Sequence, residues 1–382
     1  MPNQKERAGW YKQQDEGYET YVPKKLPPEP ELEIDGELLS LMSKADRALG
    51  RLDGTVSVLP NPDLFVTMYI RKEAILSSQI EGTQASLIDV LEYEANILDP
   101  NISDDTYEVI NYTKAMNYGL KQIQNRKRID INLMKEIHNI LLKDTRGGER
   151  KPGKLRSTQN WIGQEGCSIS EAMFVPPSVK DMKKALKELE YFINSDNSLP
   201  PLIKVGLVHA QFETIHPFLD GNGRIGRLLI TFILTMNDYL TKPLLYLSHY
   251  LKQNRLEYYD RLQSIRDKGD WEGWLKFFLK GVYNISTDST KISLKILGLK
   301  KKHYDMIMDR LGKQSGNGVL LLNSLFKQPL VNVNNVCDIM DISYPNANKL
   351  VSKFENLGIL KEITGQARNR VFEYMDYLDL LE

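Results

Sequence analysis

Apolar residues recur every three or four positions in the stretch that precedes residue 216, and this spacing predicts a helix. Its apolar positions are Leu202, Val205, Val208, Phe212 and Ile215. After a glycine-rich string, residues 228–236 read Leu-Leu-Ile-Thr-Phe-Ile-Leu-Thr-Met and are apolar on nearly every face. A helix of that kind is buried on all sides. The pattern therefore predicts two consecutive helices joined by a short polar loop, with the second helix at the centre of the molecule.

A second pattern follows residues 314–318, a run of turn-forming residues. Periodic apolar residues predict helices at 319–326, 333–340 and 344–357, and alternating residues predict strands at 359–363 and 371–374. This order resembles a winged helix, whose third helix enters the DNA major groove in many relatives. Upstream, the Lys-rich stretch 291–304 predicts a connecting helix.

The loop between the helix predicted before residue 216 and the apolar helix that follows carries groups suited to catalysis. Residues 216–227 read His-Pro-Phe-Leu-Asp-Gly-Asn-Gly-Arg-Ile-Gly-Arg. His216 can accept a proton near neutral pH. Asp220 offers the hard oxygen ligands that Mg²⁺ prefers. An ordinary turn with surface polar groups is the alternative interpretation.

The rest of this string is suited to phosphate. Gly221 and Gly223 allow the backbone to approach a phosphate closely with its N–H groups turned inward. Arg224 and Arg227 are three residues apart, so they share a helical face and offer forked donors. The start of the following helix adds unpaired N–H groups and the positive end of its dipole. Together these residues indicate a site for a nucleotide triphosphate.

The string resembles the signature of the Fic family, His-x-Phe-x-[Asp/Glu]-Gly-Asn-Gly-Arg-x-x-Arg, at every defined position. The resemblance implies a nucleotidyltransferase that moves AMP from ATP to a Ser, Thr or Tyr hydroxyl of a target protein or of itself (AMPylation). His216 would be the base, and Asp220 would hold Mg²⁺. The Doc branch, which transfers phosphate, carries Lys where this chain has Gly223, and this difference favours adenylyl transfer. The residues implied for ATP and its phosphates are Gly221, Asn222, Gly223, Arg224, Ile225, Gly226 and Arg227.

Ser77, Glu81 and Gly82 fit a second pattern, [Ser/Thr]-x-x-x-Glu-[Gly/Asn], which resembles the inhibitory helix of regulated Fic proteins. Its place before the core is that of the class with an N-terminal inhibitory helix. There the glutamate pairs with the second arginine of the signature, so Glu81 would compete with the γ-phosphate for Arg227. In an alternative interpretation the same site removes AMP from a modified protein, with Glu81 activating water. A polar helix end capped by Gly82 is the purely structural alternative.

The resemblance extends over about residues 20–285 and implies a mainly α fold: a Fic-type helical bundle with a small β-hairpin flap, followed by the winged helix. Residues 153–163 and 174–177 resemble the flap, which aligns a target segment by strand-like pairing. Residues 163–170 would be its tip. Tyr258 and Tyr259 stand where relatives place aromatic residues near the adenine, although packing between helices explains them equally well.

These features divide the chain into four parts. Residues 1–100 are expected to hold an N-terminal arm, up to about residue 30, and the helical region with the inhibitory helix. Residues 101–285 would form the catalytic core. Residues 286–317 would be the connecting helix and linker, and residues 318–382 the winged-helix-like domain.

Composition bears on the cellular location of the protein and on the partners it attracts. Fifty acidic and fifty basic residues cancel, so no overall field attracts nucleic acid or an anionic membrane. Cys167 and Cys337 lack metal-ligand spacing and indicate reduced thiols in the cytoplasm. The first residues lack an apolar signal segment, and no apolar run is long enough to span a membrane.

The C-terminal pattern keeps another class of function open, a transcription regulator whose Fic body acts as a sensor. Residues 318–382 hold six Lys or Arg against eight Asp or Glu, so few phosphate contacts are available for DNA. A local patch is still expected from Lys349, Lys353, Arg368 and Arg370. Contact with a protein is the other use of this module, and a homodimer is compatible with the sequence.

Overall fold

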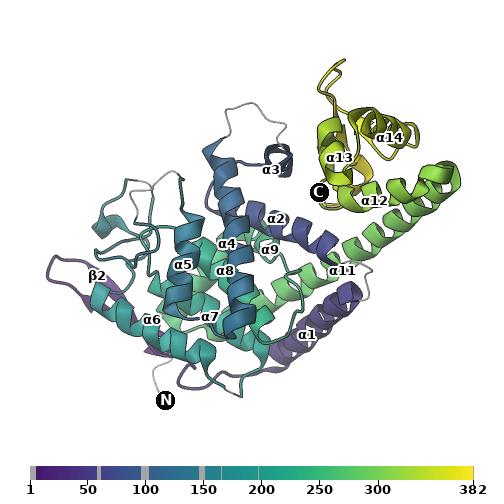
Figure 1. Cartoon of the computed structure of the whole chain (residues 1–382). Helices are drawn as coiled ribbons and strands as arrows, with labels where there is room; N and C mark the ends of the chain where they lie inside the picture. Colours follow the sequence, from purple (N-terminus) through teal and green to yellow (C-terminus); the bar gives the residue numbers. More distant parts are fainter. Residues whose placement is uncertain are drawn as a thin grey trace.

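The computed structural model describes residues 6–57, 62–95, 103–145, 151–164, 166–196 and 198–381. The described chain is mainly helical, as the sequence predicts (Figure 1). The helices are α1 (Gly36–Ser57), α2 (Pro62–Ile80), α3 (Leu87–Glu94), α4 (Asp104–Arg126), α5 (Ile131–Leu141), α6 (Val179–Asn194), α7 (Pro201–Ile215), α8 (Asn222–Met236), α9 (Ser248–Gln253), α10 (Arg255–Lys268), α11 (Trp271–Arg310), α12 (Ser315–Leu325), α13 (Val333–Met340), α14 (Tyr344–Asn356) and α15 (Met375–Leu378). Within the described residues, no helix is long and apolar enough to cross a membrane.

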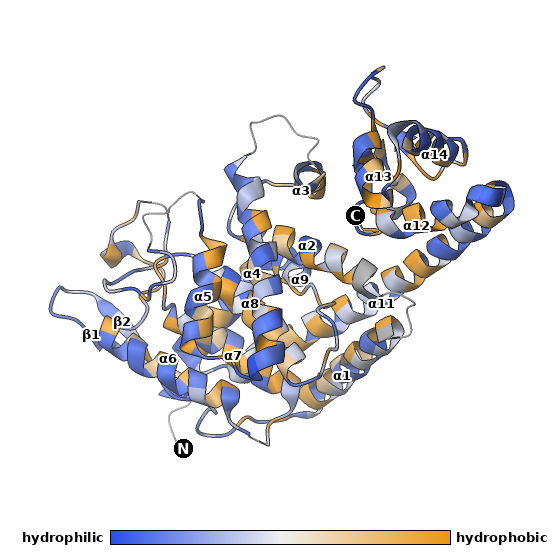
Figure 2. Cartoon of the chain, in the orientation of Figure 1, coloured by the Kyte–Doolittle hydropathy of each residue, from blue (hydrophilic) through white to orange (hydrophobic). Residues whose placement is uncertain are grey.

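Helix α8 lies at the centre of the body, as its apolar sequence predicts. It packs against α4, α5 and α7, and almost all its side chains are buried. Gly119 of α4 makes one of these crossings close, because a Cβ there would lie 2.2 Å from the Phe232 ring of α8. Polar residues cover the outward sides of α4 and α6 (Figure 2). This packing fixes the start of α8, and with it the loop from α7.

The N-terminal segment contains a β-hairpin, where the sequence predicts only an arm. Strands β1 (Gly9–Gln13) and β2 (Glu19–Pro23) pair in antiparallel fashion. Tyr21 is fully buried, its N–H donates to the Val175 carbonyl at 3.0 Å, and its ring packs against Tyr11 and Phe174. The hairpin is thus stabilised by contacts with distant residues, which local polar composition does not reveal.

Helix α11 joins the body to the C-terminal module in one uninterrupted run of 40 residues, about 60 Å long. Its first half packs with α1 and α7, and its far end carries α12, α13 and α14 (Figure 1). The expected division after residue 285 therefore falls inside a helix. The break expected at 314–318 lies a few residues earlier, between Arg310 and Ser315, where α12 begins, and a Cβ at Gly318 would lie 2.6 Å from Leu311. Gly318 is there for close packing.

We define the C-terminal module as residues 315–381. Its helices α12, α13 and α14 accompany a three-stranded antiparallel sheet of order β3-β5-β4, with β3 (Leu330–Asn332), β4 (Lys361–Glu362) and β5 (Val371–Glu373). Helices α13 and α14 match the spans expected from sequence to within one residue. Strand β3 and helix α15 are additional to the elements predicted from sequence, and the strand expected at 359–363 is reduced to two residues, Lys361–Glu362.

Candidate active site

His216 lies at the end of α7 in a left-handed conformation, with φ of 48°. Its Nδ1 lies 3.4 Å from the Glu213 carbonyl oxygen. Because a carbonyl only accepts, the proton resides on Nδ1, and Nε2 keeps its lone pair. Burial lowers the pKa of His216 to about 4. The imidazole is therefore neutral at physiological pH, the form that a general base requires.

Arg156, which no sequence pattern indicates as part of the site, holds the backbone around His216. Its Nε donates to the His216 carbonyl at 3.0 Å, and its own N–H donates to the Pro217 carbonyl at 2.9 Å. A second guanidinium nitrogen donates to the Pro177 carbonyl. Burial lowers the pKa of Arg156 to about 10. One buried side chain thus ties the expected base to both sides of the predicted flap.

The loop after His216 is shaped by a glycine and an amide. Gly221 has φ of +73°, a conformation that favours glycine. The Asn222 side chain accepts from the Phe218 N–H at 2.8 Å and donates to the Phe218 carbonyl at 2.9 Å. Asn222 is 2% exposed. Its amide is thus committed to closing the loop, and its place at the start of α8 adds a backbone N–H group.

His138 of α5 supports Asp220 from behind, and it too was missed from sequence. Its ring stacks on Phe218 with centroids 3.9 Å apart. The Gly153 N–H donates to Nδ1 at 2.8 Å, so Nε2 carries the proton and donates to the Asp220 carbonyl at 3.0 Å. Burial lowers the pKa of His138 to about 4, which keeps this neutral form.

Arg224 and Arg227 are both buried on the face of α8 predicted for them. Arg224 pairs with Glu108 of α4 at 2.9 Å, and its other terminal nitrogen lies 3.8 Å from Asp220. The neighbouring Ile225 packs in the core. Gly226 touches Glu213, since a Cβ there would lie 2.2 Å from its carboxylate. Arg224 therefore lies beside Asp220, whose carboxylate also accepts from the Gly221 N–H.

Arg227 is held by the end of α2. Its Nε donates to the Ser77 hydroxyl at 2.7 Å, and one terminal nitrogen donates to the Ser77 carbonyl at 3.0 Å and to Glu81 at 2.6 Å. Burial lowers the pKa of Arg227, but the acidic groups around it, Glu81 first, outweigh burial and leave the pKa above its ordinary value. The Glu81 carboxylate also lies against Gly223, where a Cβ would be 2.4 Å away. Gly82, with φ of +106°, follows at once.

Asp220 is the side chain that fits a metal role in this loop. Its side chain is 27% exposed, and one oxygen accepts from the Gly221 N–H at 2.7 Å. The described residues contain no cluster of three or more His, Cys, Asp or Glu that could hold a metal ion alone. A single carboxylate suits Mg²⁺ that takes its other ligands from phosphates and water.

The two expected adenine-side tyrosines differ in position. Tyr258 is 1% exposed, and its hydroxyl pairs with His209 Nε2 at 2.9 Å, so its ring is part of the core. Tyr259 is 40% exposed, with Arg255 over its ring. Burial and the charge of Glu81 raise the pKa of Tyr259. Tyr259 thus lies near Glu81 with an accessible ring.

The predicted flap is joined by one pair of residues. Ile162 and Phe174 exchange two backbone hydrogen bonds, of 2.8 and 3.1 Å. Beside them Trp161 and Met173 are exposed, Met173 by 75%. The predicted tip includes residue 165, which lies outside the described residues. An exposed apolar edge with strand-like backbone therefore stands beside the loop of His216.

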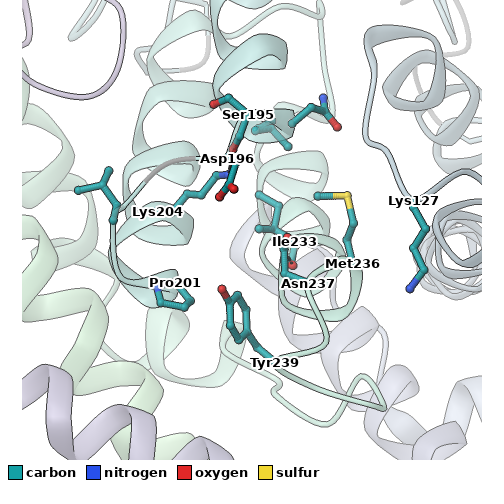
Figure 3. Close-up of a pocket in the computed structure, with 12 residues that line it drawn as sticks. Lys127, Ser195, Asp196, Pro201, Lys204, Ile233, Met236, Asn237 and Tyr239 are labelled. Carbon is teal, nitrogen blue, oxygen red and sulfur yellow. Dashed lines mark hydrogen bonds between the residues drawn. The ribbon is translucent and has the colours of Figure 1, made fainter.

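A hollow of about 280 Å³ opens at the other end of α8 (Figure 3). Its lining includes Lys127, Asp196, Lys204, Asn237 and Tyr239. Lys204 donates to the Ser195 carbonyl at 2.9 Å. Since α8 has 15 residues, or about 22 Å, this hollow is remote from the loop that begins the helix.

The sequence also matches models of a known protein family. Two family models match: "Fic/DOC family N-terminal" over residues 39–121 and "Fic/DOC family" over residues 128–234. The chain is 30% identical over 206 residues to protein adenylyltransferase Fic of Drosophila grimshawi, which covers 52% of this chain and 38% of that protein. It is 29% identical over 207 residues to the protein of the same name from Culex quinquefasciatus, covering 52% and 37%. The matches thus span little more than a third of these curated relatives.

The fold has a counterpart among solved structures. A Fic family protein from Desulfovibrio desulfuricans G20 superposes with a TM-score of 0.55, at 17% identity, covering 90% of this chain and 97% of that one. At that identity the likeness shows the fold alone.

Proposed function

Because the chain is a Fic/DOC family protein, matched over residues 39–121 and 128–234, we propose that it transfers AMP from ATP to a hydroxyl group of a protein. We further propose that Glu81 restrains this activity. The observation that carries the proposal is the arrangement of residues 216–227. At its start His216 is neutral, with Nε2 free of the ring proton. At its end the buried Arg227 is bound to Ser77 and Glu81. The named relatives are adenylyltransferases, which supports this reaction class.

In the proposed reaction His216 Nε2 accepts the proton of the target hydroxyl. The hydroxyl oxygen attacks the α-phosphorus of ATP, and the bond to the β-phosphate bridging oxygen breaks, so pyrophosphate leaves. The burial that lowers the pKa of His216 keeps the base unprotonated. The contacts of Arg156 with the His216 carbonyl and with Pro177 support a fixed distance between the base and a target segment held along the flap.

The phosphates are proposed to lie at the start of α8. Gly221 and Gly223 present backbone close to this point, Arg224 is held beside it by Glu108, and the helix dipole favours an anion. Asp220, supported by His138, would hold Mg²⁺, which supplies charge neutralisation to the triphosphate. Tyr259 is proposed on the adenine side because its ring is accessible.

Glu81 is proposed to restrain AMP transfer because it competes with the γ-phosphate for the guanidinium group of Arg227. A guanidinium binds a carboxylate or a phosphate in the same geometry and cannot serve both fully. With Glu81 bound, the γ-phosphate would be displaced from Arg227, and the α-phosphate would lie out of line with the hydroxyl. A displacement of about 1 Å can lower a rate roughly 10²-fold.

The test compares AMP transfer from labelled ATP with Mg²⁺ by wild type and by Glu81→Gly, read as modification of the chain itself and of added protein. Transfer should rise about 10²-fold in Glu81→Gly. It should fall to background in Glu81→Gly combined with His216→Ala or with Arg227→Ala. Glu16→Gly, a change at an exposed turn residue between β1 and β2, is the matched control and should behave as wild type. Equal transfer by wild type and Glu81→Gly would remove the inhibitory role.

The same experiment distinguishes the removal of AMP. If Glu81 activates water, Glu81→Gly loses the ability to strip AMP from a modified target, and wild type strips it. Added modified target therefore decides between the two interpretations of Glu81.

We also propose that the C-terminal module is a winged helix. The order α12, β3, α13, α14, β4, β5 and the sheet order β3-β5-β4 support this assignment. Its use is a separate question from the transfer reaction.

A further inference from the structure

We propose that the C-terminal module is a clamp on α2: by gripping the middle of that helix it keeps Glu81 on Arg227, so that loosening the module raises AMP transfer. The sign of this activity change rests on the proposed function. The mechanical link between the module and α2 does not.

The grip consists of charged donors of α2 bonded to backbone carbonyls of the module. Arg71 donates to the Lys327 carbonyl at 2.7 Å, and Lys72 donates to the Leu381 carbonyl at 2.5 Å. Arg71 is 7% exposed, and burial lowers the pKa of Lys72. These two residues thus hold α2 from two separate places in the module.

Helix α3 extends the same interface. Arg71 also forms an ion pair with Glu94 of α3. Asn335 of α13 donates to the Ala95 carbonyl at 3.0 Å, directly after α3. The module therefore contacts α2, whose end holds Ser77 and leads into Glu81 and Gly82, and the residue that follows α3. It is placed to bias the position of that segment.

The next turns of α2 carry the connection to Arg227. Glu73 accepts hydrogen bonds from Ser248 of α9 and Tyr112 of α4, and Ser77 and Glu81 then bind Arg227. Lys72 lies eight residues, about 12 Å, before Ile80, where α2 ends, and Glu81 follows directly. A helix moves as a rigid element over that length, so a shift at Lys72 reaches Ser77 and Glu81.

The contact between Glu81 and Arg227 depends on how α2 is held. The Glu81 side chain is 35% exposed, so packing alone does not hold it against Arg227. Its contact is set by where α2 ends. An attachment at Arg71 and Lys72 can therefore change how often Arg227 is occupied, which is how two distant sites become coupled.

The experiment compares Arg71→Ala combined with Lys72→Ala against wild type. The matched control is Lys301→Ala combined with Arg310→Ala, two exposed basic residues of α11 whose ion pairs stay within that helix. The clamp variant should transfer AMP at least about fivefold faster, the lower end of usual coupling between sites. In a Glu81→Gly background it should add nothing. If Glu81→Gly raises AMP transfer and the clamp variant transfers AMP no faster than wild type, the proposal is overturned.

Amide hydrogen exchange supplies a readout without catalysis. Exchange should rise together at residues 77–82 and at residues 377–381 in the clamp variant, and at neither in the control. Unchanged exchange at residues 77–82 overturns the proposal whatever the activity. If no variant transfers AMP, Glu81→Gly included, the proposed function fails, and exchange still decides the clamp. Lys72→Met, which keeps the aliphatic stem and loses the ammonium, replaces the double variant if that protein is insoluble.

Discussion

At the scale of single residues, the burial of His216 has a consequence for the pH dependence of transfer. In the proposed reaction His216 must be neutral to act as the base, and burial lowers its pKa to about 4. In Glu81→Gly protein we therefore expect the rate to stay level as the pH falls from 8 to about 5.5, where an ordinary histidine with a pKa near 6.5 would already be mostly protonated. Rates of self-modification across this range test the expectation. A rate that falls with an apparent midpoint near 6.5 contradicts it.

Arg156→Lys should reduce transfer about 10²-fold with little change in ATP affinity. The ammonium of lysine cannot reproduce the planar fork that binds the His216 and Pro177 carbonyls together. A small displacement of the base from the target hydroxyl has an effect of that size. The measurement is kcat beside a direct ATP titration, again in Glu81→Gly protein. Arg128→Lys, an exposed change after α4, is the control, and equal losses in both variants would count against positioning.

The place of residues 216–227, between the end of α7 and the first turns of α8, could be predicted because they form one continuous string. The supporting residues could not: His138, Arg156 and Glu108 come from distant segments, and each acts through a contact made only in the fold. The family resemblance implies Asn222 for phosphate, and the structure adds that its side chain closes the loop onto Phe218, which leaves its backbone N–H for that role. A local pattern gives the residue types of a site, but their hydrogen-bond partners depend on tertiary packing.

At the scale of elements, the crossing of α4 and α8 depends on Gly119. Gly119→Ala should lower the free energy of unfolding by about 1–3 kcal/mol, because the added methyl would overlap the Phe232 ring. Gly50→Ala in α1 meets nothing within 4 Å and should raise the free energy of unfolding by about 0.5–1 kcal/mol. Urea denaturation measures both. Similar effects of the two changes would show that the crossing tolerates a side chain.

Elements with strong apolar periodicity, such as α7, α8, α13 and α14, could be predicted from sequence. Elements that depend on long-range contacts could not. The hairpin of β1 and β2 rests on Tyr21 packing against Phe174, and β3 forms only because β5 lies beside it. Gly316 and Gly318 read as a break because glycine is common in turns, although α12 uses Gly318 to approach Leu311.

At the scale of the whole molecule, the module is attached to the body in two ways. One is covalent, through α11, and is reinforced where His303 Nδ1 pairs with the Tyr374 hydroxyl at 2.8 Å. The other is the grip on α2. In Figure 1, α14 lies on the side of the module away from α2, and that helix face is where a winged helix would meet DNA.

That face predicts weak binding to DNA. Lys353 donates to Gln314, and Arg370 donates to Asn348 with Glu355 4.0 Å away, so half of the four-residue basic patch is already engaged. About two phosphate contacts then remain, for which the logarithm of affinity should fall with a slope of about −2 against the logarithm of salt concentration. We expect affinity for any duplex to stay in the non-specific range, roughly 10⁻⁴–10⁻⁶ M at physiological salt. Fluorescence anisotropy with mixed-sequence duplexes at several salt concentrations measures both quantities. Lys349→Ala with Arg368→Ala should abolish even this binding, and nanomolar, sequence-dependent affinity would instead make the module a DNA reader.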